Sequence, residues 1–296
     1  MIRMYKTWFL ASRPWSFTMS WISVSVGAAL AALDGPFSWT LYLLTLLGTI
    51  LIHAATNLIN DYYDVRSGVD KRDVSTARYR PHPLIEGTLT LKGVRNAAWV
   101  LYVLAAGIGF YLALQRGWAI LGLALAGAFF SLTYTAPPLK YKYRALGEIG
   151  VFFMWGPVIV EGAYFVQQQV FSLAALWVSL PFGTLVALVL LANNLRDVKH
   201  DGREGIATLP MLLGKRQGRI LYLGLIVLAY LAVVVMSVLG PLALWSLIVL
   251  VSLPTAFKLF KTVARELPID ADARTAQLDT VFGVLLVISI VLNRMV

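Results

Sequence analysis

Residues 39–64 read WTLYLLTLLGTILIHAATNLINDYYD, an apolar stretch that ends in a polar and acidic string. The stretch contains no Asp, Glu, Lys or Arg before Asp61. A helix that crosses the ~30 Å hydrocarbon layer of a bilayer needs about 20 mostly apolar residues, because it rises ~1.5 Å per residue. We therefore predict a membrane-spanning helix that carries its acidic end to the bilayer surface.

The composition of the whole chain extends this prediction. Hydrophobic residues make up 59% of the 296 residues and charged residues only 14%, whereas about a quarter of the residues in a soluble domain are charged. Apolar runs of this length are helical in lipid, since a helix satisfies its own backbone hydrogen bonds. We predict an all-α membrane protein that forms one domain over residues 1–296. Its nine spans lie near residues 15–33, 39–60, 95–115, 118–135, 146–166, 172–193, 219–239, 241–260 and 277–293.

The basic residues lie on one side of this arrangement. If the N-terminus is cytoplasmic, all Lys and Arg except Arg116 and Arg294 fall in cytoplasmic segments, which is 23 of the 25. Such segregation follows the positive-inside rule. The net charge of +10 is therefore explained by basic residues in the cytoplasmic segments of a membrane protein. We predict no nucleic-acid partner. We predict a multi-pass protein of the cell membrane whose N-terminus and long loops are cytoplasmic.

Two acidic strings occupy matching places in the predicted spans. Asn60 and Asp64 close the second span, and Asn193 and Asp197 close the sixth. The offset is 133 residues in both pairs (193 − 60 and 197 − 64). Membrane folds are often built from internal repeats. We predict four spans repeated as four more, plus one added helix.

The spacing within each string places oxygen-bearing side chains on one helix face. The two sets are Asn57, Asp61 and Asp64, and Asn193, Asp197 and Asp201. Like charges at these spacings repel, and the C-terminus of a helix is already partly negative. Lys and Arg from the loops can compensate them, but clustered carboxylate and amide oxygens together with phosphate oxygens also suit Mg²⁺. One such string is explained by a helix that reaches water, whereas two in equivalent positions favour a site for metal ions and a diphosphate.

Further strings complete an ordered pattern. They are Arg13-Pro14-Trp15-Ser16, Gly68-Val69-Asp70, Tyr134-Thr135, Lys142-Tyr143-Arg144-Ala145-Leu146-Gly147-Glu148, Gly205-Ile206-Ala207-Thr208-Leu209 and Leu213-Gly214. With the two acidic strings, the chain resembles the UbiA superfamily of intramembrane aromatic prenyltransferases, and within it the MenA-like branch of 1,4-dihydroxy-2-naphthoate polyprenyltransferases. The resemblance implies nine helices around a central cavity that opens to membrane lipid. It also implies Mg²⁺-dependent transfer of a polyprenyl group from polyprenyl diphosphate to an aromatic acceptor, through an allylic cation, in menaquinone biosynthesis.

The resemblance further implies roles for individual residues. The expected catalytic set is Asp64, Asp197, Asp201 and Lys142. Metal ligands are expected among Asn60, Asp61, Asp64, Asp70, Asn193, Asp197 and Asp201. The expected contacts of the diphosphate are Arg13, Arg78, Arg80 and Lys142, and those of the allylic cation are Tyr62, Tyr63, Tyr134 and Tyr141.

Two departures from the family pattern leave alternatives open. Position 68 is Gly where many members have an acid, so the additional metal ligand is Asp61, Asp70 or Asp73. The family often has Arg at the place of His82, which is why Arg78 and Arg80 are the candidates for the phosphate.

Other functions fit the sequence less well. The chain has no Ser-His-Asp set, no zinc-type His/Cys cluster and no Walker-type loop, and His53, His82 and His200 are expected to be structural or solvated. A multi-span transporter needs polar groups near the bilayer midplane, but the outer halves of these spans carry almost no charge. Within the family, 4-hydroxybenzoate and a glycerol phosphate stay open as alternative acceptors.

Overall fold

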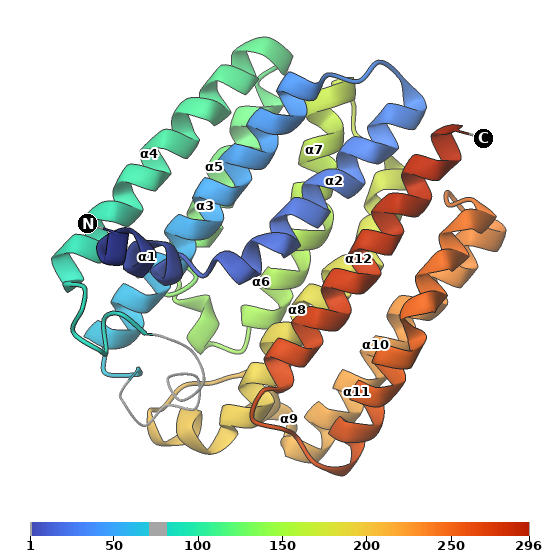
Figure 1. Ribbon diagram of the computed structural model, residues 1–296. Coiled ribbons are helices and arrows are strands. Elements are labelled where there is room, and N and C mark those ends of the chain that lie inside the picture. The colour runs from blue at the N-terminus through green and yellow to red at the C-terminus, as the bar shows by residue number, and fades with distance from the viewer. Residues whose placement is uncertain (1, 71–81, 296) are drawn as a thin grey trace.

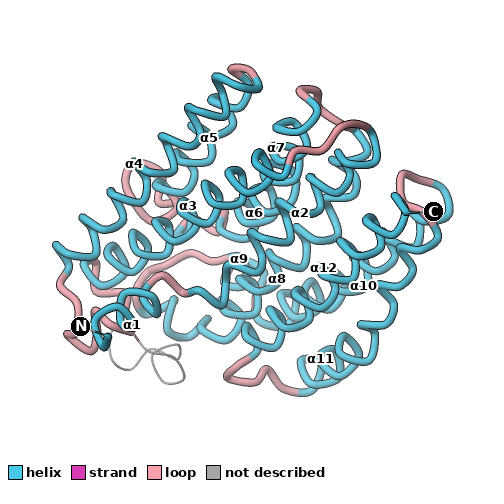
Figure 2. Tube along the Cα trace, turned by 45° about the horizontal axis from the view of Figure 1, so that its top comes forward, coloured by secondary structure: helices cyan, strands magenta, loops and turns pink. Residues whose placement is uncertain are grey.

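The computed structural model describes residues 2–70 and 82–295. Within these ranges the chain is helical, as predicted, and shows one isolated bridge between Arg144 and Ala207 but no strand. Figure 1 shows the long helices side by side in a bundle with the short α1 lying across one end, and Figure 2 shows the bundle from a second direction. The elements up to residue 168 are α1 (Ile2–Ala11), η1 (Pro14–Ser16), α2 (Phe17–Asp34), α3 (Trp39–Arg66), α4 (Leu91–Arg116), α5 (Ala119–Thr133), η3 (Tyr141–Tyr143), α6 (Gly147–Phe153), η4 (Met154–Val158) and α7 (Ile159–Gln168). The remaining elements are α8 (Leu173–Arg203), α9 (Leu209–Leu213), α10 (Lys215–Leu239), η5 (Leu244–Ser252), α11 (Leu253–Arg265) and α12 (Ala271–Met295).

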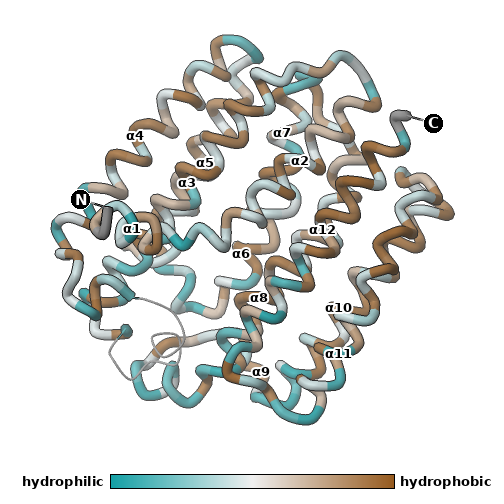
Figure 3. The backbone as a smooth tube through the Cα atoms, viewed as in Figure 1, coloured by the Kyte–Doolittle hydropathy of each residue, from teal (hydrophilic) through white to brown (hydrophobic). Residues whose placement is uncertain are grey.

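Eight helical segments in the described part of the chain are long and apolar enough to cross a bilayer. Three of them are composite. The span Pro14–Asp34 joins η1 and α2, the span Gly147–Gln168 joins α6, the π-helical turn η4 and α7, and the span Leu244–Arg265 joins η5 and α11. Figure 3 shows hydrophobic residues along these helices and hydrophilic residues mainly at their ends. The chain is therefore a multi-pass membrane protein. The predicted span near 118–135 corresponds to α5, which has only 15 residues, so the count of nine and the internal repeat stay predictions.

The two helices that carry the acidic strings run past their predicted spans. α3 continues to Arg66 and α8 to Arg203, whereas the apolar windows end at 60 and 193. The helices continue because backbone hydrogen bonding does not depend on whether a side chain is apolar. Both helices also begin alike, since the hydroxyl oxygens of Ser38 and Ser172 accept hydrogen bonds from backbone N–H groups of their first turns. The acidic strings thus lie on final helical turns and have fixed positions relative to each other.

Helix packing leaves a space beside α3. α3 packs along α4, α2 along α7, and α8 along both α10 and α12. α2 and α7 touch at Gly27, where a Cβ atom would lie 2.1 Å from the carbonyl oxygen of Val160. The region bounded by α3, α4, α5 and α7 is not closed by such helix packing. The acidic ends of α3 and α8 face into it.

Candidate active site

A cavity of about 720 Å³ occupies this region. One end is lined by residues of both acidic strings and by Lys142, among others: Asn60, Asp64, Asp70, Asn193, Asp197, Asp201 and Lys142. We call it the carboxylate end. Away from it the wall is apolar and includes Leu44, Ile108, Leu112, Leu123 and Val166. Segments that lie 133 residues apart in the sequence (193 − 60) therefore share one cavity.

Asp64 is the centre of the contacts at the end of α3. Its side chain is only 2% exposed, and it accepts hydrogen bonds from Lys142 Nζ at 2.5 Å and from the Tyr143 hydroxyl. Lys142 Nζ also donates to Asn60 Oδ1 at 3.1 Å. Burial lowers the pKa of Lys142, but the charge of Asp64 outweighs burial and holds that pKa above its ordinary value. Lys142 is therefore a charged ammonium group at the cavity wall.

Asp61 faces Arg13 rather than the cavity. The two side chains form an ion pair, and Asp61 is not among the described residues that line the cavity, whereas Arg13 is. The cavity face of α3 is formed by Asn57, Asn60 and Asp64. Asp61, predicted on this face, points elsewhere because neighbouring residues of a helix point ~100° apart, and its role as a metal ligand stays a prediction.

Asp70 lies just beyond α3 and contacts His82. His82 Nε2 donates to Asp70 Oδ2 at 3.2 Å. Burial raises the pKa of Asp70, but the hydrogen bond from His82 and the charges of Lys142 and Arg13 outweigh burial and lower that pKa to about 2. One ligand atom from each of Asp61, Asp70 and His82 lies within 4.8 Å of the others. Asp70 is thus an ionised carboxylate on the cavity wall, and its oxygens can act as metal ligands.

Arg196 holds the acidic string of α8. Its guanidinium donates at least five hydrogen bonds, to Asp197 (3.0 and 2.7 Å), Asn193 (2.5 Å), Asp272 (3.1 Å) and the carbonyl oxygen of Ile269 (3.0 Å). These contacts join α8 to the start of α12. Asp201, one turn further along α8, accepts no side-chain hydrogen bond or ion pair from the described part of the chain. It is therefore the carboxylate of this string that is least engaged by the protein.

Basic side chains compensate both strings. Lys142 pairs with Asp64, and Arg196 pairs with Asp197 and Asp272. From the sequence, either basic side chains or metal ions could compensate the negative charge of the two strings. The contacts of Lys142 and Arg196 show that basic side chains compensate part of it. The cavity still collects more carboxylate and amide oxygens than these cations contact, since Asp201 is not bound by either of them.

Two of the four tyrosines predicted to face a cation line the cavity. They are Tyr134 and Tyr141, whose ring centroids lie 5.2 Å apart. Tyr62 and Tyr63 are not among the described lining residues and pack with the apolar cluster of α1, α3 and α4. The acid and amide residues of α3 form its cavity face, and the rings of Tyr62 and Tyr63 point to other sides of the helix.

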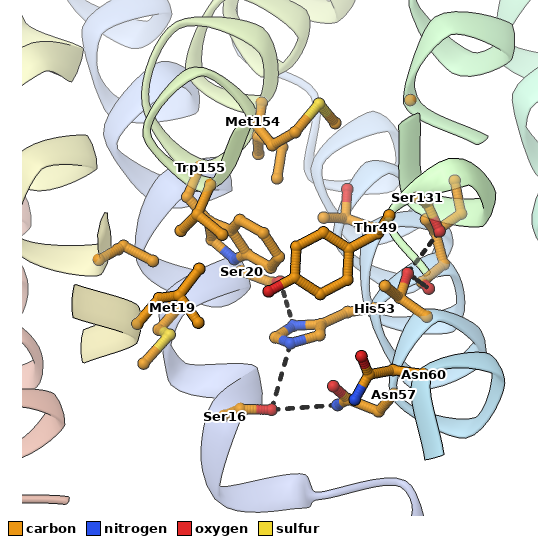
Figure 4. A pocket seen from close by; sticks show the side chains of 18 of the residues that line it. Ser16, Met19, Ser20, Thr49, His53, Asn57, Asn60, Ser131, Met154 and Trp155 are labelled. Atoms are coloured by element: carbon orange, nitrogen blue, oxygen red, sulfur yellow. Dashed lines mark hydrogen bonds between the residues drawn. The ribbon is translucent and has the colours of Figure 1, made fainter. Parts of the chain in front are cut away.

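The cavity also contains residues that the sequence analysis missed. Asp272, in the first turn of α12, lines the carboxylate end. In the sequence, only its position just before an apolar span could have suggested a role at the site. His53, expected to be structural, lines the cavity beside Trp155, as Figure 4 shows. Three predicted residues lie outside the described ranges: Asp73, Arg78 and Arg80.

The cavity therefore combines a charged end with an apolar body. Clustered carboxylate and amide oxygens are hard ligands that suit a divalent cation, and an ammonium group such as Lys142 gives charge-assisted hydrogen bonds to anionic oxygens. A site with this division suits a molecule that has an anionic head and an apolar tail.

Comparison with known families agrees with this chemistry. The sequence pattern of the UbiA prenyltransferase family matches residues 20–282. The chain belongs to this family. The resemblance stated from the motifs is thus confirmed: the protein is a UbiA-family prenyltransferase, an enzyme with many helices in the membrane.

Two curated relatives are similar to this UbiA-family prenyltransferase over most of its length. The 1,4-dihydroxy-2-naphthoate octaprenyltransferase of Bacillus subtilis (strain 168) is 29% identical over 289 residues, which cover 95% of this chain and 91% of the relative. The UbiA prenyltransferase domain-containing protein 1 homolog of Drosophila melanogaster is 31% identical over 291 residues, which cover 96% of this chain and 79% of the relative.

A solved structure is similar to the fold of this UbiA-family prenyltransferase. The UbiA homolog from Archaeoglobus fulgidus bound to GPP and Mg²⁺ gives a TM-score of 0.62 at 14% identity, over 95% of this chain and 99% of the other. The fold is therefore UbiA-like, as the resemblance predicts.

Proposed function

We propose that this enzyme transfers a polyprenyl group from polyprenyl diphosphate to an aromatic acceptor, 1,4-dihydroxy-2-naphthoate, in menaquinone biosynthesis. The observation that carries the proposal is a single cavity with two acidic strings and Lys142 at one end and an apolar wall elsewhere. The name of the Bacillus subtilis relative supports naphthoate as the acceptor. The Archaeoglobus fulgidus homolog bound to GPP and Mg²⁺ supports a prenyl diphosphate as the donor.

The oxygen donors at the carboxylate end fit Mg²⁺. They comprise carboxylates and side-chain amides from both strings, the hard ligands that Mg²⁺ takes together with phosphate oxygens and water. The residues that would hold it are Asp64, Asp70, Asp197 and Asp201, with Asn60 and Asn193. When bound, Mg²⁺ neutralises negative charge on the diphosphate and so makes it a better leaving group.

The remaining parts of the cavity bind the donor and protect the reacting carbon. Lys142, with a side chain 20% exposed, is placed to donate to diphosphate oxygens. Its Nζ lies 5.9 Å from the centroid of the Tyr134 ring, so this ring sits where the charged end meets the apolar wall. An aromatic face at such a desolvated position stabilises a cation by about 2 kcal/mol. The apolar wall excludes water from the allylic cation.

Asp201 gives a test of metal binding. Because no described side chain pairs with its carboxylate, Asp201→Asn removes a ligand without leaving a basic partner uncompensated. We expect the Mg²⁺ concentration for half-maximal activity to rise at least about tenfold, measured by titrating Mg²⁺ against product formation. The matched control is Asp270→Asn, whose carboxylate pairs with Arg274 at the surface. An unchanged Mg²⁺ requirement in Asp201→Asn would contradict the assignment.

Gly162 tests whether the apolar wall holds the prenyl tail. It lines the cavity on α7, and a Cβ atom there would meet the Leu123 side chain only at 3.8 Å, so a larger side chain can enter the cavity. We expect Gly162→Leu to lower kcat/KM for geranylgeranyl diphosphate relative to geranyl diphosphate by about tenfold or more. Gly122→Leu, on the exposed side of α5 with nothing within 4 Å, is the control. Equal loss for both donors would place the tail elsewhere.

We also infer that the carboxylate end faces the cytoplasm of the cell membrane, because the basic residues gather on that side of the spans. The chain has no cysteine, so a single cysteine introduced at the exposed Arg203 can be labelled selectively. A membrane-impermeant maleimide should label it in inverted vesicles and not in intact cells, and the reverse pattern would overturn the orientation.

The acceptor is decided by a direct assay. Purified enzyme is incubated with Mg²⁺, labelled geranylgeranyl diphosphate, and 1,4-dihydroxy-2-naphthoate, 4-hydroxybenzoate or a glycerol phosphate. Prenylation of the naphthoate supports the proposal, whereas transfer only to one of the other acceptors keeps the chemistry but changes the substrate. If the enzyme consumes no donor in a Mg²⁺-dependent way with any acceptor, the proposed function is wrong.

A further inference from the structure

A buried hydrogen bond joins the start of α6 to the acidic end of α8. Asn194 Nδ2 donates to Glu148 Oε1 at 2.9 Å, and both residues are 5% exposed. The two helices pack against each other, and Figure 1 shows them side by side. Asn194 lines the cavity, whereas Glu148 is not among the described lining residues. Seen from the cavity, Glu148 therefore lies behind Asn194.

This hydrogen bond fixes which way the Asn194 amide points. A carboxylate can only accept, and an amide donates through its nitrogen and accepts through its oxygen. The nitrogen must therefore face Glu148, which leaves Asn194 Oδ1 on the other side of the amide group. This oxygen accepts no hydrogen bond from the described residues, and it is not among their buried atoms that lack a partner. Asn194 Oδ1 is thus the polar atom that this residue presents to the cavity.

Asn194 shares a helix face with two acids of the second string. Asp197 and Asp201 follow it on α8 at i + 3 and i + 7, and both also line the cavity. Side chains three or four residues apart on a helix have Cβ atoms ~5–6 Å apart, so their oxygens can reach one cation. The three cavity residues of α3 have the same spacing. Asn194 Oδ1 therefore adds a neutral oxygen to a row of carboxylates.

Residues 142–148 contact both acidic strings. At one end of this segment Lys142 bonds Asp64 of α3, and at the other end Glu148 bonds Asn194 of α8. Backbone hydrogen bonds to the chain that follows α8 hold the segment between these two contacts. Because the two contacts are separate, a substitution of Glu148 can release the Asn194 amide without removing the cation.

The chemistry of Asn194 Oδ1 selects the kind of group that it binds. An amide oxygen is a hard ligand that suits Mg²⁺ or a water bound to it. The same oxygen repels the negative oxygens of a diphosphate, and a prenyl tail offers it no hydrogen bond. The carboxylates one and two turns further along α8 favour a cation at this place as well.

We propose, on the basis of the proposed function, that Asn194 is a further ligand for Mg²⁺ or its bound water at the carboxylate end. Glu148 is the positioning residue that holds the Asn194 oxygen toward the cavity. It touches neither metal nor substrate, and it acts through the orientation of one amide. Without Glu148 the amide is free to turn, and its N–H groups then face the cation in place of the oxygen.

The test compares Glu148→Met with Glu148→Gln in the full-length enzyme. Methionine is similar in size but is a poor acceptor, whereas glutamine keeps an oxygen that accepts from Asn194 Nδ2. Mn²⁺, which takes the same hard oxygen ligands, is titrated into the substrate-free enzyme in detergent, and electron paramagnetic resonance measures the free ion. We expect the dissociation constant of Mn²⁺ to rise about tenfold or more in Glu148→Met and to stay within about twofold of the parent in Glu148→Gln.

A double variant checks that Glu148 acts through Asn194. Asn194→Leu removes the ligand, and Glu148→Met added to it replaces both partners by apolar groups, which keeps the pair buried without an unmatched polar atom. We expect Asn194→Leu and the double variant to weaken Mn²⁺ binding equally, because the second change has nothing left to orient. If Glu148→Met alone does not fold, the double variant carries the comparison with the parent enzyme.

Gln167→Met is the matched control. Gln167 is a buried amide at the other end of the same span, its Oε1 accepts from the Ser38 backbone N–H at 2.9 Å, and it is not a described lining residue. We expect its Mn²⁺ dissociation constant to equal that of the parent within about twofold. A loss of affinity as large as that of Glu148→Met would assign the effect to buried amides in general and overturn the inference.

The other outcomes separate this inference from the proposed function. Folded Glu148→Met or the double variant with the Mn²⁺ affinity of the parent overturns this inference alone, and so do equal losses in Glu148→Met and Glu148→Gln. A change confined to KM for the aromatic acceptor also overturns it, because Asn194 Oδ1 would then accept from an acceptor hydroxyl. A parent enzyme that binds no Mn²⁺ and consumes no donor overturns the proposed function and this inference together.

Discussion

Asp64→Asn should lower turnover by roughly 10²–10³-fold, because it removes a preorganised charge at the site where the diphosphate leaves. Asparagine keeps the size of the side chain and keeps an oxygen that can accept from Lys142 Nζ, which now lies 2.5 Å from the carboxylate. The fold should therefore persist. Product formation at saturating substrates and Mg²⁺ gives the activity, and size-exclusion chromatography in detergent checks the fold.

The matched control is Asp61→Asn, the same substitution three residues earlier on α3. Asp61 pairs with Arg13 and is not a described lining residue of the cavity. We expect its activity to fall less than about tenfold, which corresponds to 1.4 kcal/mol. Equal losses at the two positions, or near-normal turnover of Asp64→Asn, would mean that Asp64 does not contact the donor or its metal.

Arg196→Leu should destabilise the protein by about 3–5 kcal/mol, because it leaves buried carboxylates without their cation. The guanidinium side chain is only 6% exposed and contacts both Asp197 and Asp272. It also contacts the carbonyl oxygen of Ile269, just before α12. The substitution therefore loosens α12 from α8 and shifts the second acidic string. Thermal unfolding in detergent measures the effect, and activity should be lost with it.

The control for this prediction is Arg203→Leu, at the end of the same helix. Arg203 is exposed, so its replacement should change the free energy of unfolding by no more than about 0.5 kcal/mol. If Arg196→Leu were as stable as the parent enzyme, the buried ion pairs at the end of α8 would not hold the helices together. If both variants unfolded early, the loss would reflect charge at the membrane surface rather than these contacts.

The helices and the acidic strings were predictable because both depend on local composition. Long apolar runs predict spans, and the 133-residue offset between Asn60 and Asn193 predicts equivalent positions at the same side of the bundle. Contacts between distant segments were not predictable. Arg196 reaches Asp272, 76 residues later in the chain, and the sequence around either residue gives no sign of the pairing.

The choice between the two possible faces of α3 has a geometric basis. Spacing of three or four residues is shared by the sets Asn57–Asp61–Asp64 and Asn57–Asn60–Asp64, so periodicity alone does not decide which set faces the cavity. In the structure Asp61 pairs with Arg13, and Asn60 lines the cavity. Once that face is fixed, Tyr62 and Tyr63 turn to the packing between α1, α3 and α4.

His53 and Trp155 illustrate a different limit of the sequence. A lone histidine in an apolar run and a tryptophan in a span are both usual in membrane helices, where they pack or lie near the interface. Their positions at the cavity wall depend on a hydrogen bond from Ser20 of α2 to His53 and on the π-helical turn η4 that contains Trp155, and neither feature has a local sequence signal apart from Pro157.

The shortness of α5 has a consequence for the surrounding lipid. Its 15 residues extend ~22 Å at ~1.5 Å per residue, which is ~8 Å less than the ~30 Å of hydrocarbon. If α5 spans the bilayer as predicted, local thinning of the bilayer is one way to meet this hydrophobic mismatch, and headgroups of one leaflet would then be drawn toward the α5 side of the bundle. α5 also forms part of the cavity wall. The proposed prenyl diphosphate donor would then have a shortened route between leaflet and enzyme at this edge.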